Sequence, residues 1–205
     1  MKEICEPCGI YVNRMSEQRK TSDQRKKKVN EPFLWESFKK GQSWAFKRIY
    51  MDYYDALFNY GSRMLHSESE AKDLIQDLFI RLWTRRRSLP GIRNLKGYLF
   101  TALRSVIIDY FRAGSRQVVD SDFLSGHTNF NISAEQEIID RETTKETETF
   151  LLQSLDSLSN REKEAIYLRY YQNLDHKEIG RIMGLRYQSV RNLIHKALRS
   201  LREKM

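Results

Sequence analysis

The stretch that most constrains the fold lies near the C-terminus, from Leu174 to Leu201, and reads LDHKEIGRIMGLRYQSVRNLIHKALRSL. Apolar residues recur at helical spacing on both sides of Gly184, a residue type that often ends a helix in the left-handed conformation. Asp175 followed three residues later by Glu178 is the pattern of a capping box, which marks a helix start. The same pattern predicts two further helix starts, at Ser67 with Glu70 and at Ser159 with Glu162. The stretch therefore predicts two helices joined by a tight turn, a helix-turn-helix.

The second predicted helix carries apolar residues on one face and cationic or amide side chains on the other. Arginine matches the acceptor edge of guanine, and asparagine or glutamine pairs with adenine, so this polar face predicts contacts in the major groove of DNA. The alternative is a helical hairpin whose basic face is only solvated. The polar face consists of Tyr187, Gln188, Arg191, Asn192, His195, Lys196 and Arg199.

Composition agrees with a helical protein that binds a polyanion. The 205 residues include only 3 prolines and 9 glycines, and long stretches follow the helical period, which predicts an all-α fold. The net charge of +9 favours nucleic acid or an acidic membrane surface as partner. Because no apolar run reaches membrane-spanning length and the first residues lack the apolar core of a signal peptide, we expect a cytoplasmic protein without membrane insertion.

The two cysteines of the chain, Cys5 and Cys8, have the spacing of half a zinc site. No second cysteine pair completes such a site, and the 4 histidines show no ligand spacing. We therefore expect free thiols in a reduced N-terminal extension, no metal site and no cofactor.

Changes in composition divide the chain into four parts. Residues 1–30 are polar and predict a flexible extension, whereas residues 31–114 and 149–205 predict two small helical domains. Residues 115–148 are rich in acidic residues, Gly, Ser and Asn, and predict a flexible acidic linker between the domains. We expect the core of the first domain to include Phe33, Leu34, Phe38, Trp44, Phe46, Ile49, Tyr50, Tyr53, Tyr54, Leu57, Phe58 and Tyr60.

A helix predicted from Ser69 to Trp83 has two usable faces. Its apolar face is expected to pack in the core and consists of Leu74, Ile75, Leu78, Phe79 and Leu82. A second strip follows the spacing i, i+3, i+4, i+7 and consists of Asp73, Gln76, Asp77 and Ile80. Such a strip suits docking onto a basic partner helix, with a solvated acidic face or a pair of metal ligands as alternatives. The strip has no His or third acid nearby, which argues against a metal.

The segment from Arg81 to Arg116 is the most basic part of the chain, with nine basic residues and one acid. Pro90 and Gly91 interrupt it with a loop, and helical periodicity returns from Leu95 to Arg112. The residues expected to face inward on this helix are Leu99, Leu103, Val106, Ile107 and Tyr110. Loop amides, arginines and aromatic rings together suit a single strand or a melted duplex. A basic face that binds the backbone of intact duplex is the alternative.

Four segments, in this order and spacing, resemble the extracytoplasmic-function (group IV) sigma factors of bacterial RNA polymerase. They read YYDALFNYGSRML, EAKDLIQDLFIRLWTRR, IRNLKGYLFTALRSVIIDYFR and LSNREKEAIYLRYYQNLDHKEIGRIMGLRYQSVRNLIHKALRSLR. The resemblance covers residues 33–112 and 151–202, and the EAKDLIQDLF segment with its following LW is its most specific part.

The resemblance implies two helical domains, region two and region four, on a flexible linker. It also implies three partners: core RNA polymerase, contacted at its clamp coiled coil and flap, promoter DNA, and an anti-sigma factor. The residues that fall on the family's polymerase-docking surface are Asp73, Gln76, Asp77, Ile80 and Trp83. Those that fall on the loop and helix that open the minus-ten element are Arg85, Arg86, Arg87, Arg93, Asn94, Lys96, Tyr98, Arg104 and Arg112.

On the minus-thirty-five recognition helix, the resemblance adds Arg186 and Ser189 to the polar face described above. The family often opens this helix with a small or hydroxyl residue, whereas this chain has Arg186 and Tyr187. We therefore predict a promoter-specificity subunit without catalytic residues. One rival is a stand-alone helix-turn-helix regulator, which would dimerise. The other is a DNA-processing enzyme, which needs an acid cluster or activated nucleophile that the sequence lacks.

Overall fold

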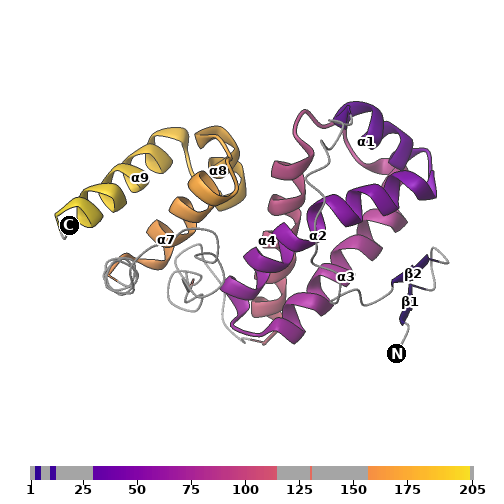
Figure 1. Ribbon diagram of the computed structural model, residues 1–205, viewed down its shortest axis with the longest axis horizontal. Coiled ribbons are helices and arrows are strands. Elements are labelled where there is room, and N and C mark those ends of the chain that lie inside the picture. The colour runs from indigo at the N-terminus through magenta and orange to yellow at the C-terminus, as the bar shows by residue number, and fades with distance from the viewer. Residues whose placement is uncertain (1–2, 6–9, 13–29, 115–129, 131–156, 204–205) are drawn as a thin grey trace, which may run out of the picture.

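The structure, a computed structural model, describes residues 3–5, 10–12, 30–114, 130 and 157–203 (Figure 1). Four helices form an N-terminal unit of residues 31–114, and three helices form a C-terminal unit of residues 157–203. The N-terminal unit consists of α1 (Glu31–Lys39), α2 (Ser43–Leu65), α3 (Glu68–Arg85), a 3-10 turn η1 (Arg86–Ser88) and α4 (Leu95–Gly114). The C-terminal unit consists of α7 (Asn160–Ile166), a π-helical turn η4 (Tyr167–Tyr171), α8 (His176–Met183) and α9 (Tyr187–Arg202).

Local sequence signals set the helix ends of the N-terminal unit. A proline lies in the first turn of α1, where its missing N–H costs no hydrogen bond. His66 ends α2 in the left-handed conformation, with φ 57°. The hydroxyl of Ser67 then caps α3 by accepting from the backbone N–H of Glu70 at 3.3 Å. The cap at Ser67 confirms the helix start that the sequence predicted there.

The core of the N-terminal unit lies where α2 packs against α3 and α4. All five apolar residues predicted to face inward on α3 are buried. Two aromatic predictions are wrong, because Phe33 is 61% exposed and Trp44 is 47% exposed. These two residues lie in the first turns of α1 and α2 and pack on each other, with ring centroids 6.1 Å apart.

Tyr110 is the third corrected assignment, since it is 40% exposed rather than inward. It lies near the end of α4, where its phenol donates a hydrogen bond of 2.9 Å to Glu70. The other four residues predicted to face inward on α4 are buried.

The C-terminal unit has the predicted helix-turn-helix. Asp175 and Glu178 form the reciprocal capping box at the start of α8. Gly184 ends α8 in the left-handed conformation, with φ 67°. Ser159 and Glu162 form a second capping box at the start of α7. All three features confirm predictions from sequence.

Two short strands, β1 (Glu3–Cys5) and β2 (Ile10–Val12), pair antiparallel, with Cys5 opposite Ile10. The sequence predicted a flexible extension here, so this pairing is a difference from expectation. Most of that extension lies outside the described residues, as does the predicted linker 115–148 except for Phe130. Among the described helices, none is long and apolar enough to cross a membrane.

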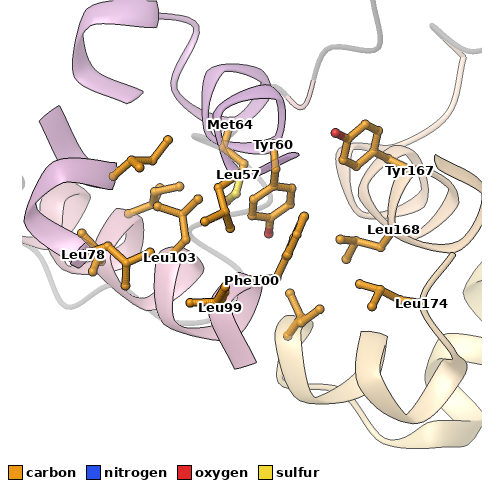
Figure 2. Close-up of a cluster of buried hydrophobic side chains, with 14 of the residues drawn as sticks. Leu57, Tyr60, Met64, Leu78, Leu99, Phe100, Leu103, Tyr167, Leu168 and Leu174 are labelled. Atoms are coloured by element: carbon orange, nitrogen blue, oxygen red, sulfur yellow. The ribbon is translucent and has the colours of Figure 1, made fainter. Parts of the chain in front are cut away.

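The two units share one continuous apolar core, which the sequence analysis did not predict. Figure 2 shows Tyr60 and Phe100 of the N-terminal unit beside Tyr167, Leu168 and Leu174 of the C-terminal unit. Helix α4 packs directly against α8 (Figure 1). The linker residue Phe130, 1% exposed, also packs at this junction. Its ring centroid lies 6.0 Å from that of Tyr60 and 5.4 Å from that of Tyr167.

Candidate nucleic-acid and partner interfaces

The acidic strip lies on the outer face of α3, as its spacing predicted. Asp73, Gln76 and Asp77 are exposed, and Ile80 is half-buried. The apolar face on the other side of α3 holds the strip in place by packing in the core. The result is a rigid, negatively charged surface with an apolar end, which suits a basic helix of a partner.

Trp83 extends this strip but belongs partly to the core. Its ring centroid lies 5.2 Å from that of Phe46 and 6.0 Å from that of Phe38. The guanidinium of Arg86 lies 4.4 Å from the centre of the Trp83 ring and donates a hydrogen bond of 2.7 Å to the Trp83 carbonyl. Arg86, which the resemblance assigned to promoter opening, therefore holds the end of α3 in this structure.

Three other cations of the promoter-opening set are exposed: Arg85 is the last residue of α3, and Arg87 and Arg93 lie on the segment between α3 and α4. Arg112 is exposed near the end of α4 and pairs with Asp109 at 3.7 Å. These four side chains are available to phosphates, since each lies on the surface of the N-terminal unit.

Two residues that sequence reasoning did not single out hold this segment in place. The indole N–H of Trp35 donates to the carbonyl of Pro90 at 2.9 Å. The carboxylate of Glu31 accepts from the backbone N–H of Leu95 at 3.1 Å, at the start of α4. Tyr98 packs edge-on against Trp35 at 5.2 Å and is half-buried, which raises the pKa of its phenol. The Tyr98 side chain is therefore a fixed, neutral aromatic group.

Asn94 and Lys96 contact the C-terminal unit rather than solvent alone. The side-chain oxygen of Asn94 accepts from the N–H of Gly97 at 2.7 Å, which caps α4, and its amide nitrogen donates to Glu178. The ammonium of Lys96 donates to the carbonyl of Gln172 at 2.7 Å. Burial lowers the pKa of Lys96, although the nearby carboxylate of Glu178 acts in the opposite direction.

Arg104 and Tyr60 of the N-terminal unit both bind Glu164 of the C-terminal unit. The Nε of Arg104 donates to Oε1 of Glu164 at 3.0 Å, and the Tyr60 hydroxyl donates to the same oxygen at 2.6 Å. Burial opposes the charge on Arg104, but the Glu164 carboxylate outweighs it and raises the Arg104 pKa. Burial, together with the charge of Glu164, also raises the pKa of Tyr60. The network is therefore an ion pair joined by a neutral phenol.

Helix α9 presents its whole predicted polar face to solvent. Every residue assigned to minus-thirty-five recognition is exposed, including Arg186 and Ser189. Gln188 donates to Asn192 at 3.1 Å, one turn along the helix. The Tyr187 ring packs edge-on against His176 at 5.7 Å, which fixes an aromatic group at the start of α9.

Beneath this face lies Glu162, which sequence reasoning identified only as a helix cap. One carboxylate oxygen accepts from the N–H and the hydroxyl of Ser159, at 2.8 and 2.7 Å, and the other lies 3.2 Å from the ammonium of Lys196. Burial alone would raise the pKa of Glu162, but the Ser159 hydrogen bonds and the Lys196 charge outweigh it and lower the pKa. Glu162 therefore stays ionised next to a lysine of the exposed face.

No group of three or more His, Cys, Asp or Glu side chains within the described part of the chain could hold a metal ion. The three surfaces instead offer charge, amides and aromatic rings, which suit binding to a protein helix and to nucleic acid.

Comparison with known families decides what these surfaces belong to. The profile described as Sigma-70 region 2 matches residues 49–117, and that described as Sigma-70, region 4 matches residues 154–203. The chain belongs to the extracytoplasmic-function sigma factors. It is thus a promoter-specificity subunit of RNA polymerase, a class of transcription initiation factor.

Two curated relatives and one solved structure illustrate the match. RNA polymerase sigma factor YlaC of Bacillus subtilis is 27% identical over 158 residues, covering 77% of this sigma factor and 90% of YlaC. ECF RNA polymerase sigma factor SigL of Mycobacterium tuberculosis is 26% identical over 158 residues, covering 76% and 86% respectively. The sigma factor RpoE of Bartonella quintana, solved in complex with the anti-sigma factor NepR, has a TM-score of 0.56 and 24% identity. That comparison covers 78% of this sigma factor and 95% of the RpoE chain, and it supports the fold.

Proposed function

We propose that this sigma factor divides promoter recognition among the three surfaces described above. The strip on α3, with Trp83 at its end, docks on the clamp coiled coil of core polymerase, and the C-terminal unit contacts the flap. The basic segment before α4 and the α4 face open the minus-ten element, and the polar face of α9 binds the minus-thirty-five element. The proposal rests on one observation above all, that every residue of the α9 polar face is exposed.

The chemistry of each surface supports its proposed role. Arginine and amide side chains on an exposed helix can pair with base edges in the major groove. Exposed arginines beside a fixed tyrosine can hold phosphates and stack an unpaired base. Two DNA contacts on one chain raise each other's effective concentration, so that weak individual contacts give useful affinity.

An anti-sigma factor is the proposed regulator, since RpoE of Bartonella quintana was solved with one. We propose that the chain acts in the cytoplasm, where polymerase and promoter DNA are found, and that it performs no catalysis of its own. The polymerase supplies the chemistry of RNA synthesis, and the sigma factor supplies only binding energy and position.

The test is in vitro transcription with bacterial core polymerase on a pooled promoter library, with and without the protein. We expect start-site-specific transcripts that depend on the protein, and the enriched templates should share two elements. If a competent core stays silent while the protein alone binds duplex tightly, the stand-alone regulator replaces this proposal.

A further inference from the structure

Helix α1 and the turn that follows it contact the segment between α3 and α4 at three points. We call this segment, residues 86–94, the α3–α4 loop. It carries the exposed arginines Arg87 and Arg93 of the promoter-opening set. Helix α1 lies at the same end of the N-terminal unit as the loop and packs against its η1 turn (Figure 1). The three contacts fall at the beginning, the middle and the end of the loop.

At the beginning of the loop, the Arg86 guanidinium lies between Gly41, just after α1, and the Trp83 ring. A Cβ atom added at Gly41 would lie 3.1 Å from Nε of Arg86. Gly41 also has a φ of 82°, a conformation that favours glycine. The missing side chain at Gly41 therefore leaves room for Arg86 to reach the Trp83 carbonyl.

The middle and the end of the loop are held by hydrogen bonds. The indole N–H of Trp35 donates to the carbonyl of Pro90, and Trp35 is 1% exposed. One oxygen of Glu31 accepts from the backbone N–H of Leu95, directly after the loop. The other oxygen of Glu31 accepts from the Tyr53 hydroxyl at 3.1 Å. Because Tyr53 belongs to α2, Glu31 ties the end of the loop to the body of the N-terminal unit.

These hydrogen bonds fix the path of the loop without using its side chains. Both reach backbone groups, a carbonyl and an N–H, whereas Arg87 and Arg93 stay exposed. Trp35 also packs against the Tyr98 ring, so one tryptophan positions both the loop backbone and the aromatic ring that follows it. A loop that is already ordered loses less conformational freedom when it binds an unpaired strand.

We propose that Glu31 and Trp35 are positioning residues for promoter opening, which preset the α3–α4 loop in the shape that captures an unpaired strand. They act through the loop backbone and need no contact with DNA. The region 2 profile matches from residue 49, after α1 ends, so that match gives neither residue a role. This inference rests on the proposed function of the loop in opening the minus-ten element.

The test compares single-round transcription from two templates with the same promoter, taken from the enriched library. One template is fully duplex, and the other has a mismatched, unpaired minus-ten segment. A poorly positioned loop should cost more on the duplex, where capture of the strand must hold the DNA open. The measured quantity is the ratio of duplex transcript to mismatched transcript. Loss of folded protein lowers both transcripts alike and leaves this ratio unchanged.

The first variant, Trp35→Phe, keeps an aromatic ring but removes the N–H that binds Pro90. We expect it to lower the ratio about fivefold, the effect of losing one buried hydrogen bond. The matched control, Trp44→Phe, makes the same change at a tryptophan that is 47% exposed and packs on Phe33. This control should leave the ratio unchanged.

The second variant, Glu31→Ala, removes both hydrogen bonds of the carboxylate. It should lower the ratio about tenfold, because hydrogen bonds to a charged group are the stronger ones. Glu31→Gln keeps one of the two acceptor oxygens and should restore part of the ratio. The matched control, Glu36→Ala, removes an exposed carboxylate of the same helix that pairs with Lys39, and should leave the ratio unchanged.

Two further measurements separate opening from docking. Permanganate reactivity of unpaired thymines on the duplex template should fall in the same order of variants as the transcript ratio. Binding to core polymerase, measured by fluorescence anisotropy, should persist in all of them, because the exposed acidic strip on α3 is unchanged.

An unchanged ratio for both Trp35→Phe and Glu31→Ala overturns the inference, and so does an equal fall of the ratio in the matched controls. If circular dichroism shows that Trp35→Phe does not fold, Glu31→Ala decides, because Glu31 is only half-buried. Failure of the proposed function looks different, since the parent protein would then be silent on both templates.

Discussion

Glu162 joins the fold of the C-terminal unit to its DNA-binding face, because one oxygen caps α7 and the other pairs with Lys196. We expect Glu162→Gln to lower the free energy of unfolding by about 1 kcal/mol, since the amide can still cap but cannot form the ion pair. Urea unfolding of the full chain measures this change. Glu203→Gln, which removes an exposed ion pair with Arg199, is the control and should have a smaller effect.

The difference in free energy of unfolding between the wild type and Glu162→Gln should become smaller as pH falls. Because the folded state lowers the pKa of Glu162, the ionised group adds stability above its unfolded pKa, and this stability disappears as pH falls through the folded pKa. Wild type and variant should therefore converge in acid. A difference that stays constant into acid would mean that the charge of Glu162 does not stabilise the fold.

Arg191 lies in the middle of the exposed face of α9, and its guanidinium has the donor geometry that pairs with guanine. If it pairs with a base, Arg191→Ala should weaken binding to the enriched promoters by about 1–3 kcal/mol and leave scrambled duplex almost unaffected. Anisotropy titrations on both duplexes measure this. Arg202→Ala, which removes the same charge from the exposed end of α9, should weaken both duplexes alike. If Arg191→Ala weakened binding to promoter duplex and to scrambled duplex equally, Arg191 would contact a phosphate rather than a base.

At the scale of elements, the exposed acidic strip on α3 is the proposed docking surface for polymerase. Asp73→Lys with Asp77→Lys should weaken binding to core polymerase at least tenfold, because like charges would then face the partner helix. Circular dichroism should show an unchanged fold, since both side chains are exposed. The pair Glu36→Lys with Asp55→Lys, also exposed, makes the same change in net charge on other helices. Loss of binding in both pairs would point to net charge rather than to the strip.

The helix-turn-helix depends on close backbone contact at Gly180. A Cβ atom there would lie 2.7 Å from the carbonyl oxygen of Leu185, closer than real atoms approach. Gly180→Ala should therefore destabilise the chain by about 1–3 kcal/mol in urea unfolding, despite the higher helix propensity of alanine. Gly91→Ala, where an added Cβ meets nothing within 4 Å, is the control and should be nearly neutral. Equal stability of both variants would mean that the turn can relax.

Sequence predicted most of these elements because their signals are local. Each capping pair, Ser159 with Glu162 and Asp175 with Glu178, sets a helix start within four consecutive residues. Gly184 ends α8 through its own left-handed backbone conformation. Exposure near helix ends was harder to predict. Phe33 and Trp44 fit a helical period, yet the first turns of α1 and α2 leave one side of each helix uncovered.

At the scale of the whole molecule, the junction between the units could not be predicted from local signals. Arg104 and Glu164 are 60 residues apart, with the acidic linker segment between them. No local sequence pattern around either residue predicts that the two side chains pair. The spacing of Arg104 and Lys96 correctly placed both on α4, but it could not show that the chain supplies its own acceptors for them.

A shared core predicts cooperative unfolding of the two units. All three tryptophans, Trp35, Trp44 and Trp83, lie in the N-terminal unit, so tryptophan emission follows that unit alone, whereas far-ultraviolet circular dichroism follows every helix. Because Tyr167 and Leu168 pack against Tyr60 and Phe100, we expect the two signals to give the same thermal midpoint.

The variant Tyr167→Ala should separate the two signals. It removes a fully buried ring from the junction and should cost about 3–5 kcal/mol, mostly from the C-terminal unit. That unit is small enough to be only marginally stable alone, so its dichroism should be lost at a lower temperature than the tryptophan signal. Tyr170→Ala, an exposed ring on the same π-helical turn, is the control and should leave the midpoints together. Separate midpoints in the wild type would mean that the two units unfold independently despite their shared core.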